Sequence, residues 1–226
     1  MSRFLLFEEC KLLMDKLSLV REETKKLFFG ASGSHDWDHT LRVYNLCKHI
    51  GEKEGADMKI LLLAALLHDI GRGEQDKSKG EICHAELGTK MAPKILEKHG
   101  FDSKTIDSVV HCIERHRFKR GAAPESLEAK VLFDADKLDS IGAIGIARSI
   151  HFSGEHGAKV HNHDHPDIEN TKEYSEEDTA YREFNVKLKK VKDRMLTEEG
   201  KRIAEGRHEF MISFFNQINR EVDGEL

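Results

Sequence analysis

Two side chains that commonly bind metal ions stand next to each other at the end of an apolar run. Residues 60–67 contain no polar side chain, and His68 and Asp69 follow directly. The run predicts a segment that is buried on all sides, in which an imidazole beside a carboxylate needs a partner. A divalent cation would neutralise the carboxylate and use a ring nitrogen, whereas a buried His and Asp can also satisfy each other by hydrogen bonding. The dipeptide alone leaves both interpretations open.

Two further stretches carry the same residue types. Upstream, residues 34–43 read SHDWDHTLRV, and downstream, residues 132–139 read LFDADKLD. Each segment is compatible with a helix, and enough chain separates the three for them to converge. The order is His, then His-Asp, then Asp, which predicts a site of two histidines and two aspartates for a divalent metal ion.

With these stretches in view, the chain resembles the HD-domain phosphohydrolase superfamily, whose defining pattern is H…HD…D. Within it, the chain is similar to a bacterial and archaeal branch of small stand-alone HD proteins over nearly its whole length, including DADKLDSIGAIGIAR at 134–148 and segments between 195 and 211. The resemblance implies one all-α HD-type domain over residues 1–226. Its metal-binding helices would occupy about 30–150, and a C-terminal helical extension about 179–222.

The resemblance also selects among the candidate ligands. It takes His39 as the first ligand because of the small-Leu-x-Val sequence that follows, and it leaves His35, four residues earlier, as an assisting residue on the same helical face. Of the two downstream aspartates it selects Asp136, so that Asp134 points roughly 160 degrees away around the helix. The implied metal ligands are His39, His68, Asp69 and Asp136.

The chemistry expected of such a site is hydrolysis. Imidazoles and carboxylates without thiolate suit Mn, Fe, Co, Ni or Zn better than Ca or Mg. The sequence does not identify the ion, and Mg stays on the list of candidates. Such an ion polarises a phosphoryl oxygen and lowers the pKa of its bound water. Asp69 and Asp139 are the predicted catalytic residues. Asp139, one turn after Asp136, would orient a ligand or a water; the alternative is a solvated carboxylate.

Some branches of the superfamily hold a second ion, bound by histidines between the His-Asp pair and the final Asp. His84, His111 and His116 fall in this interval, and His84 and His116 fit such patterns best. The alternative interpretation is that these two histidines line the pocket and hydrogen-bond to a substrate phosphate.

Phosphate recognition requires cations near the metal. The candidates for substrate binding are Arg72, Lys77, Lys137 and Arg148. A basic cluster around His116 is either a solvated helix end or a further phosphate contact; it consists of Arg115, Arg117, Lys119 and Arg120. Four more histidines lie in an acidic, loop-like segment, where we expect them to be solvated; they are His156, His161, His163 and His165.

Composition limits the remaining possibilities. With 7% aromatic residues and only 3 prolines, the sequence favours helices over strands. The net charge of −5 makes nucleic acid an unlikely partner. The 4 cysteines form no C-x-x-C pair and predict reduced thiols of a cytoplasmic protein. The longest apolar run, 60–67, is far shorter than the roughly 18 residues of a membrane span. A homo-oligomer is possible.

Apolar periodicity and capping residues predict where the helices lie. Asp57 caps a buried helix that Gly71 ends, and Ser103 caps a later one. A long loop at about 153–177 is a candidate lid near the site. The predicted helices are 4–29, 39–54, 57–70, 84–99, one from 103, one that contains Leu132, Asp136 and Ile144, 179–196 and 197–222.

The predicted function is that of an enzyme, a metal-dependent phosphohydrolase that acts on a nucleotide or a related phosphoester. Within the similar branch, some members resemble enzymes that split nucleoside triphosphates into monophosphate and pyrophosphate. One alternative is a mixed-valent di-iron oxygenase, in which His84 and His116 complete two metal positions. Another is a nucleotide-sensing module that binds without turnover. Iron stoichiometry with oxygen consumption, and the presence or absence of product, distinguish the three.

Overall fold

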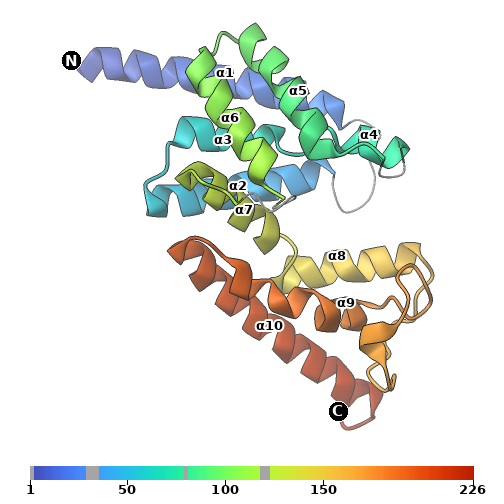
Figure 1. Cartoon of the computed structure of the whole chain (residues 1–226). Helices are drawn as coiled ribbons and strands as arrows, with labels where there is room; N and C mark the ends of the chain where they lie inside the picture. Colours follow the sequence, from blue (N-terminus) through green and yellow to red (C-terminus); the bar gives the residue numbers. More distant parts are fainter. Residues whose placement is uncertain (1–2, 29–35, 79–80, 118–122) are drawn as a thin grey trace. The chain divides into compact units, whose positions relative to one another are not determined.

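The computed structural model describes residues 3–28, 36–78, 81–117 and 123–226, with only the backbone described at 3–7, 9 and 10. Figure 1 shows helices joined by turns and loops, and the described residues include no strand. The prediction of an all-α fold is therefore confirmed. The chain divides into two compact units, Met1–Ala135 and Asp136–Leu226. The single domain expected from the sequence stays a prediction.

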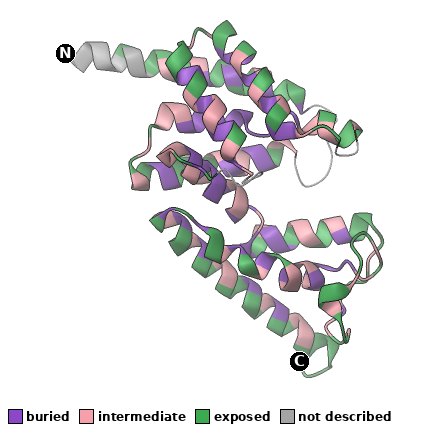
Figure 2. Ribbon diagram, in the orientation of Figure 1, coloured by how far each residue is buried: buried purple, intermediate pink, exposed green. Residues whose placement is uncertain are grey.

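The centre of the first unit is α3 (Met58–Leu67), the apolar helix that precedes the His-Asp pair. It packs against α1 (Arg3–Leu27), α2 (Trp37–Glu54) and α6 (Ser103–Arg115). All residues from Leu61 to Leu67 are buried, as the absence of polar side chains predicts (Figure 2). The unit also contains α4 (Arg72–Lys77), α5 (His84–Lys98) and most of α7 (Leu127–Leu138).

Local hydrogen bonds explain where the helices of this unit begin. Asp36 caps α2 by accepting from the backbone nitrogen of His39, which holds that histidine in the first turn. Asp57 caps α3 as predicted, and its own backbone nitrogen donates to Glu128 of α7. The cap of α6 is Asp102, not the predicted Ser103, because its carboxylate reaches the backbone nitrogen of Thr105.

The turn after α3 differs from the prediction. The helix ends at Leu67 instead of Ile70, and the short helix α4, which the sequence analysis missed, begins at Arg72. Gly71 has a φ of −87°, so it does not end the helix through a left-handed conformation. A Cβ added there would lie 2.5 Å from the backbone oxygen of His84. The glycine therefore allows the turn to touch the start of α5.

The second unit is built around α10 (Glu198–Val222), which packs against α8 (Gly142–Glu155). The single helix predicted through Asp136 and Ile144 is wrong, because extended backbone at Ile141 and a φ of 77° at Gly142 separate α7 from α8. The helix predicted over 179–196 is also wrong. It is divided into α9 (Ala180–Val186) and two 3-10 helices, η3 (Leu188–Lys190) and η4 (Lys192–Arg194).

The segment between α8 and α9 is largely irregular, as predicted, although α8 continues to Glu155 and η2 (Ile168–Asn170) forms within it. Two of its histidines bond to residues in the last turn of α10 or directly after it and are not simply solvated, which corrects the expectation for them. His161 bonds to Asn219 at 2.7 Å and His163 to Asp223 at 3.0 Å, and their rings stack. A lid role for this segment stays a prediction.

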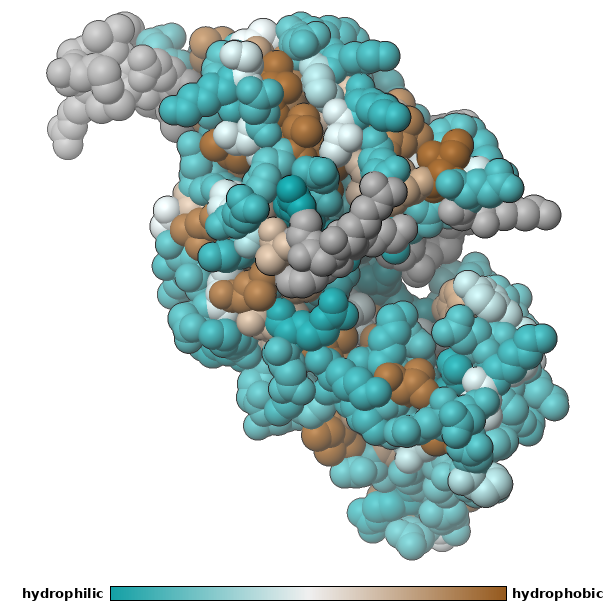
Figure 3. Space-filling model, viewed as in Figure 1, coloured by the Kyte–Doolittle hydropathy of each residue, from teal (hydrophilic) through white to brown (hydrophobic). Residues whose placement is uncertain are grey.

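The surface drawn in Figure 3 is mainly hydrophilic, with separate apolar patches. Exposed large apolar side chains occur on both units, among them Leu12 and Leu19 of α1 and Phe210 of α10. None of the described helices is both long enough and apolar enough to cross a membrane.

Candidate metal centre

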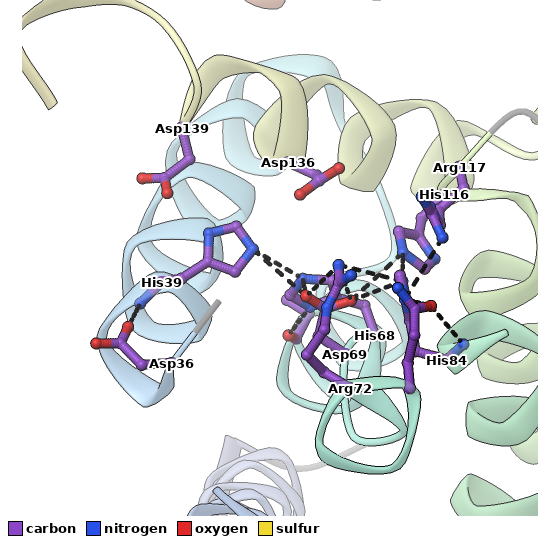
Figure 4. Close-up of polar contacts among 12 residues, drawn as sticks. Asp36, His39, His68, Asp69, Arg72, His84, His116, Arg117, Asp136 and Asp139 are labelled. Carbon is purple, nitrogen blue, oxygen red and sulfur yellow. Dashed lines mark hydrogen bonds and ion pairs between the residues drawn. The ribbon is translucent and has the colours of Figure 1, made fainter. Parts of the chain in front are cut away.

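The His-Asp pair lies in the turn between α3 and α4, at the inner end of the most buried helix. His68 follows the last residue of α3, and Asp69 comes next. His39 reaches the pair from the first turn of α2. All three side chains are no more than 1% exposed. The structure thus brings together three of the four ligands that the sequence analysis selected (Figure 4).

The carboxylate of Asp69 faces two sets of nitrogens. Its Oδ2 lies 3.8 Å from Nε2 of His39 and 3.9 Å from Nε2 of His68. Its Oδ1 lies 2.9 Å from Nε2 of His84 and 3.7 Å from Nε2 of His116. His84 begins α5 and His116 directly follows α6, so four helix ends or first turns supply these imidazoles. Each oxygen of Asp69 therefore faces one pair of imidazoles.

Asp136 belongs to the same constellation through α7. This helix is continuous across the point where the two units divide, and Leu132 to Ala135 just before it are buried. The ligand atoms of His39, His68 and Asp136 lie within 4.8 Å of one another, and the same holds for those of Asp69, His84 and His116. These are the two groups among the described residues whose geometry suits a metal ion.

Hydrogen bonds on the far side of three rings determine which nitrogen faces the centre. Nδ1 of His68 lies 2.8 Å from the backbone oxygen of Ala65, and Nδ1 of His116 lies 2.6 Å from that of Ile113. Nδ1 of His84 lies 2.8 Å from Oε1 of Gln75. Each of these oxygens accepts, so each Nδ1 carries a hydrogen, and Nε2 is the nitrogen at which a neutral ring would offer its lone pair.

These Nε2 atoms converge on one another. The Nε2 atoms of His84 and His116 are 3.3 Å apart, and those of His39 and His68 are 3.4 Å apart. Burial lowers the pKa of His84 to about 4, although the neighbouring carboxylate of Asp69 acts in the opposite direction. The ring is therefore neutral at pH 7, and its lone pair faces a carboxylate oxygen. Imidazole and carboxylate donors of this kind fit divalent cations, which each of the two ligand groups could hold.

Comparison with known proteins agrees with this geometry. Residues 36–141 match the model of the HD domain. The protein YpgQ of Bacillus subtilis is 34% identical over 209 residues, which cover 91% of this chain and 93% of that protein. The chain belongs to the HD-domain family.

Solved HD proteins share the fold over almost the whole chain. The crystal structure of YpgQ in complex with ADP is 32% identical, with a TM-score of 0.71, and the match covers 93% of this chain and 96% of that one. An HD-superfamily hydrolase from Bacillus thuringiensis is 30% identical, with a TM-score of 0.74 and coverage of 93% and 98%. The chain is thus a YpgQ-like member of the HD-superfamily hydrolases.

Two arginines lie beside the HD centre. Nη2 of Arg72 is 3.3 Å from Oδ2 of Asp69 and 3.5 Å from Nε2 of His84. Nη1 of Arg117 is 3.5 Å from Nδ1 of His84, on the opposite side of the ring. Arg72 was a predicted substrate contact, whereas Arg117 was only one member of the basic cluster. Lys119 and Arg120 of that cluster, and also His35, lie outside the described residues.

The other predicted substrate cations are paired with carboxylates. Lys77 is exposed and bonds to Glu74 at 2.7 Å, and Lys137 bonds to its neighbour Asp136 at 2.8 Å. Nη1 of Arg148 bonds to a carboxylate oxygen of Asp139 at 2.7 Å and to its backbone oxygen at 2.9 Å. These pairs hold the side chains in place, and a role in substrate binding stays a prediction for all three.

The remaining candidates near the motif are placed as follows. Asp139 is 1% exposed and paired, so the alternative of a solvated carboxylate is wrong. Asp134 is fully buried and belongs to neither metal-ligand group. His111 also belongs to neither group. Gln75 was missed altogether, because no motif contains it and its contact with His84 depends on how α4 approaches α5.

Proposed function

We propose that this protein is a metal-dependent phosphohydrolase that acts on a nucleotide. The observation that carries the proposal is the convergence of four buried imidazole Nε2 atoms on the two oxygens of Asp69, in a region from which water is largely excluded. A protonated His84 would not compensate the buried charge of Asp69, because burial keeps the ring of His84 neutral. A divalent cation at each set of ligands would.

The proposed ligands form two positions that share Asp69. His39, His68 and Asp136 would hold one ion, and His84 and His116 the other. An ion bound there supplies Lewis-acid chemistry, because it polarises a phosphoryl oxygen and acidifies a coordinated water. The second position departs from the interpretation that the sequence slightly favoured, in which these two histidines line the pocket. Their two Nε2 atoms face each other and Asp69, not an open space.

The arginines supply the part of the site that would recognise phosphate. A guanidinium group binds phosphate oxygens with two parallel hydrogen bonds, and Arg72 and Arg117 flank the ring of His84. They would orient the phosphate chain and offset its negative charge. YpgQ has been crystallised in complex with ADP, which favours a nucleotide over other phosphoesters as the substrate that we propose for this protein. Cleavage of a nucleoside triphosphate into monophosphate and pyrophosphate is the specific reaction we propose.

Asp139 completes the proposed set. Its buried carboxylate has a fixed direction, because Nη1 of Arg148 binds both its side chain and its backbone. A carboxylate held in this way can accept a hydrogen bond from a ligand or a water and so orient it. We keep the role predicted from the sequence, that of an orienting group.

The test is a screen for hydrolysis. Chelator-treated protein is incubated with nucleoside mono-, di- and triphosphates and with simple phosphoesters, each in the presence of Mn²⁺, Co²⁺, Zn²⁺ or Mg²⁺. We expect ion-dependent release of phosphate or pyrophosphate from a nucleotide. Asp69→Asn should lower this rate by about 100-fold or more, since it removes a ligand from both positions. Asp107→Asn, at an exposed position of α6, is the matched control.

Two outcomes would contradict the proposal. No release from any nucleotide with any ion would refute it, and tight nucleotide binding without product would favour a sensing module. The two ligand groups around Asp69 also suit a di-iron oxygenase, which is the second candidate. Two irons per chain together with oxygen consumption would favour that function. The arginines beside His84 argue for phosphate chemistry, since an oxygenase does not require them.

A further inference from the structure

Gln75 contacts His84 twice through a single oxygen. Its Oε1 lies 2.8 Å from Nδ1 of the ring and 3.1 Å from the backbone nitrogen of the same residue. His84 is the first residue of α5, and Cys83 before it provides no side-chain cap. Gln75 belongs to α4, so a side chain from one helix serves both the backbone and the ring at the start of another.

The shared oxygen settles where the ring hydrogen lies. A backbone N–H can only donate, so the atom of the Gln75 amide that faces it is the oxygen and not the NH₂ group. The same oxygen faces Nδ1 of His84, and an oxygen of this kind only accepts. Nδ1 therefore carries a hydrogen, and Nε2 is the nitrogen that faces Oδ1 of Asp69, at 2.9 Å.

The position of His84 explains why a side chain is needed. His68 and His116 stand at the ends of α3 and α6, where each Nδ1 donates to a backbone oxygen three residues earlier, in the last turn. His84 stands at the beginning of its helix, so no preceding helical turn offers it a carbonyl. The acceptor must come from elsewhere, and Gln75 supplies it.

The backbone brings Gln75 into place. α4 packs against α5, and the backbone nitrogen of Gln75 donates to the carbonyl of Gly71 at 3.2 Å. Gly71 in turn lies so close to His84 that a Cβ would be 2.5 Å from its backbone oxygen. This approach fixes the distance between the two helices, and the glutamine side chain spans it.

We propose that Gln75 is a positioning residue, which fixes the tautomer and the orientation of His84 so that Nε2 faces Asp69 and the second cation position. The proposal deepens the proposed function and rests on it as far as the metal is concerned. A metal-binding histidine commonly donates its other N–H to an acceptor that fixes the ring, and loss of that acceptor weakens metal binding.

The test reads the tautomer directly in metal-free protein. In ¹⁵N-labelled protein, the shifts of the two ring nitrogens of His84 distinguish a protonated from an unprotonated nitrogen. The wild type should show hydrogen on Nδ1 only. Gln75→Met, which keeps length but removes the oxygen, should shift His84 toward hydrogen on Nε2, where Asp69 accepts it. Gln75→Glu should restore the wild-type pattern, because a carboxylate oxygen also accepts.

Two controls separate positioning from a loss of structure. The signals of His68 and His116, whose acceptors are backbone oxygens, should stay unchanged in all variants. Glu74→Met on the same helix is the second control. Among the described contacts, the side chain of Glu74 pairs only with the exposed Lys77, so this variant should leave the tautomer of His84 unchanged. If Gln75→Met disturbs the signals of His68 and His116, the test rests on Gln75→Glu. That variant must keep the wild-type tautomer of His84 to support the proposal.

Metal binding gives a second readout. Titration with Zn²⁺ by calorimetry should show about 10–100-fold weaker binding of one ion in Gln75→Met, with Gln75→Glu close to the wild type. An unchanged His84 tautomer in Gln75→Met would overturn the proposal, whatever the activity. A wild type with hydrogen on Nδ1 that binds no metal and hydrolyses nothing would refute the proposed function and leave the role of Gln75 as the ring's acceptor intact.

Discussion

The Nε2 atoms of His84 and His116 lie 3.3 Å apart, although both rings carry their hydrogen on Nδ1. When both rings are neutral, two lone pairs at this distance repel each other, and the carboxylate of Asp69 adds a negative charge beside them. All three groups are buried, so water does not screen the repulsion. A divalent cation bound by these atoms in the folded chain would remove this cost, and the unfolded chain does not hold these ligands together.

Divalent metal should therefore stabilise the protein. An ion that binds only the folded chain adds about 2.7 kcal/mol to the free energy of unfolding when its free concentration is 100 times Kd. Urea unfolding of chelator-treated protein, with and without Zn²⁺, Mn²⁺ or Co²⁺, measures this gain. Ca²⁺ is the matched comparison, because it prefers oxygen ligands and should add less. A midpoint that none of these ions changes would contradict the metal centre.

The second cation position can be tested separately from the first. We expect the wild type to bind two equivalents after equilibrium dialysis and His116→Gln to lose one, because only the Asp69, His84 and His116 group is broken. His111→Gln, on α6 but in neither group, is the control. Elemental analysis of dialysed protein gives the counts. Equal counts for His116→Gln and the wild type would show that His116 is not a ligand.

Signals that lie close together in the sequence predicted much of the structure. The apolar run at 60–67 identified α3, and Asp57 identified its start, because both act within one or two helical turns. The resemblance to HD proteins selected His39 beside the His68-Asp69 pair, and these three residues meet in space. In these places the local preference and the packing of the chain agree.

Contacts between distant residues explain what the sequence did not predict. The break between α7 and α8 is fixed by Gly142, where a Cβ would lie 2.8 Å from Cγ of Arg207 on α10. Similarly, Gln75 has no feature of its own that marks it, and it acquires a role only because Gly71 lets α4 approach α5. Periodicity describes one helix at a time and carries no information about such approaches.

The Asp139–Arg148 pair should contribute strongly to stability. Asp139 is 1% exposed and Arg148 16%, and their side chains are 2.7 Å apart. Arg148→Met would leave a buried carboxylate without this cation and should cost about 3 kcal/mol of the free energy of unfolding. Lys201→Met, which breaks an exposed pair with Glu198, should cost about 0.5 kcal/mol or less. Urea unfolding compares the two variants.

The same variants bear on the predicted substrate role of Arg148. If Arg148 also binds phosphate, Arg148→Lys should raise KM for the nucleotide even in conditions where the variant is fully folded. If the arginine serves only Asp139, KM should stay at the wild-type value while kcat falls, because the orientation of that carboxylate changes. An unchanged kcat and KM would exclude both roles.

The charge of the residue that caps α6 should make the protein less stable at acidic pH. The backbone N–H and the hydroxyl of Thr105 donate to the carboxylate of Asp102 and hold its pKa below the ordinary value of 3.8. A carboxylate with a lowered pKa in the folded chain stabilises it fully above its unfolded pKa, and this contribution is lost as the pH falls through the lower folded value.

Asp102→Asn keeps a side-chain oxygen but cannot titrate. Thermal unfolding at several pH values should therefore show a wild-type midpoint that exceeds that of Asp102→Asn near pH 7, with a difference that shrinks as the pH drops below 3.8. A difference that is constant across this range would show that the charge of Asp102 does not contribute to the cap.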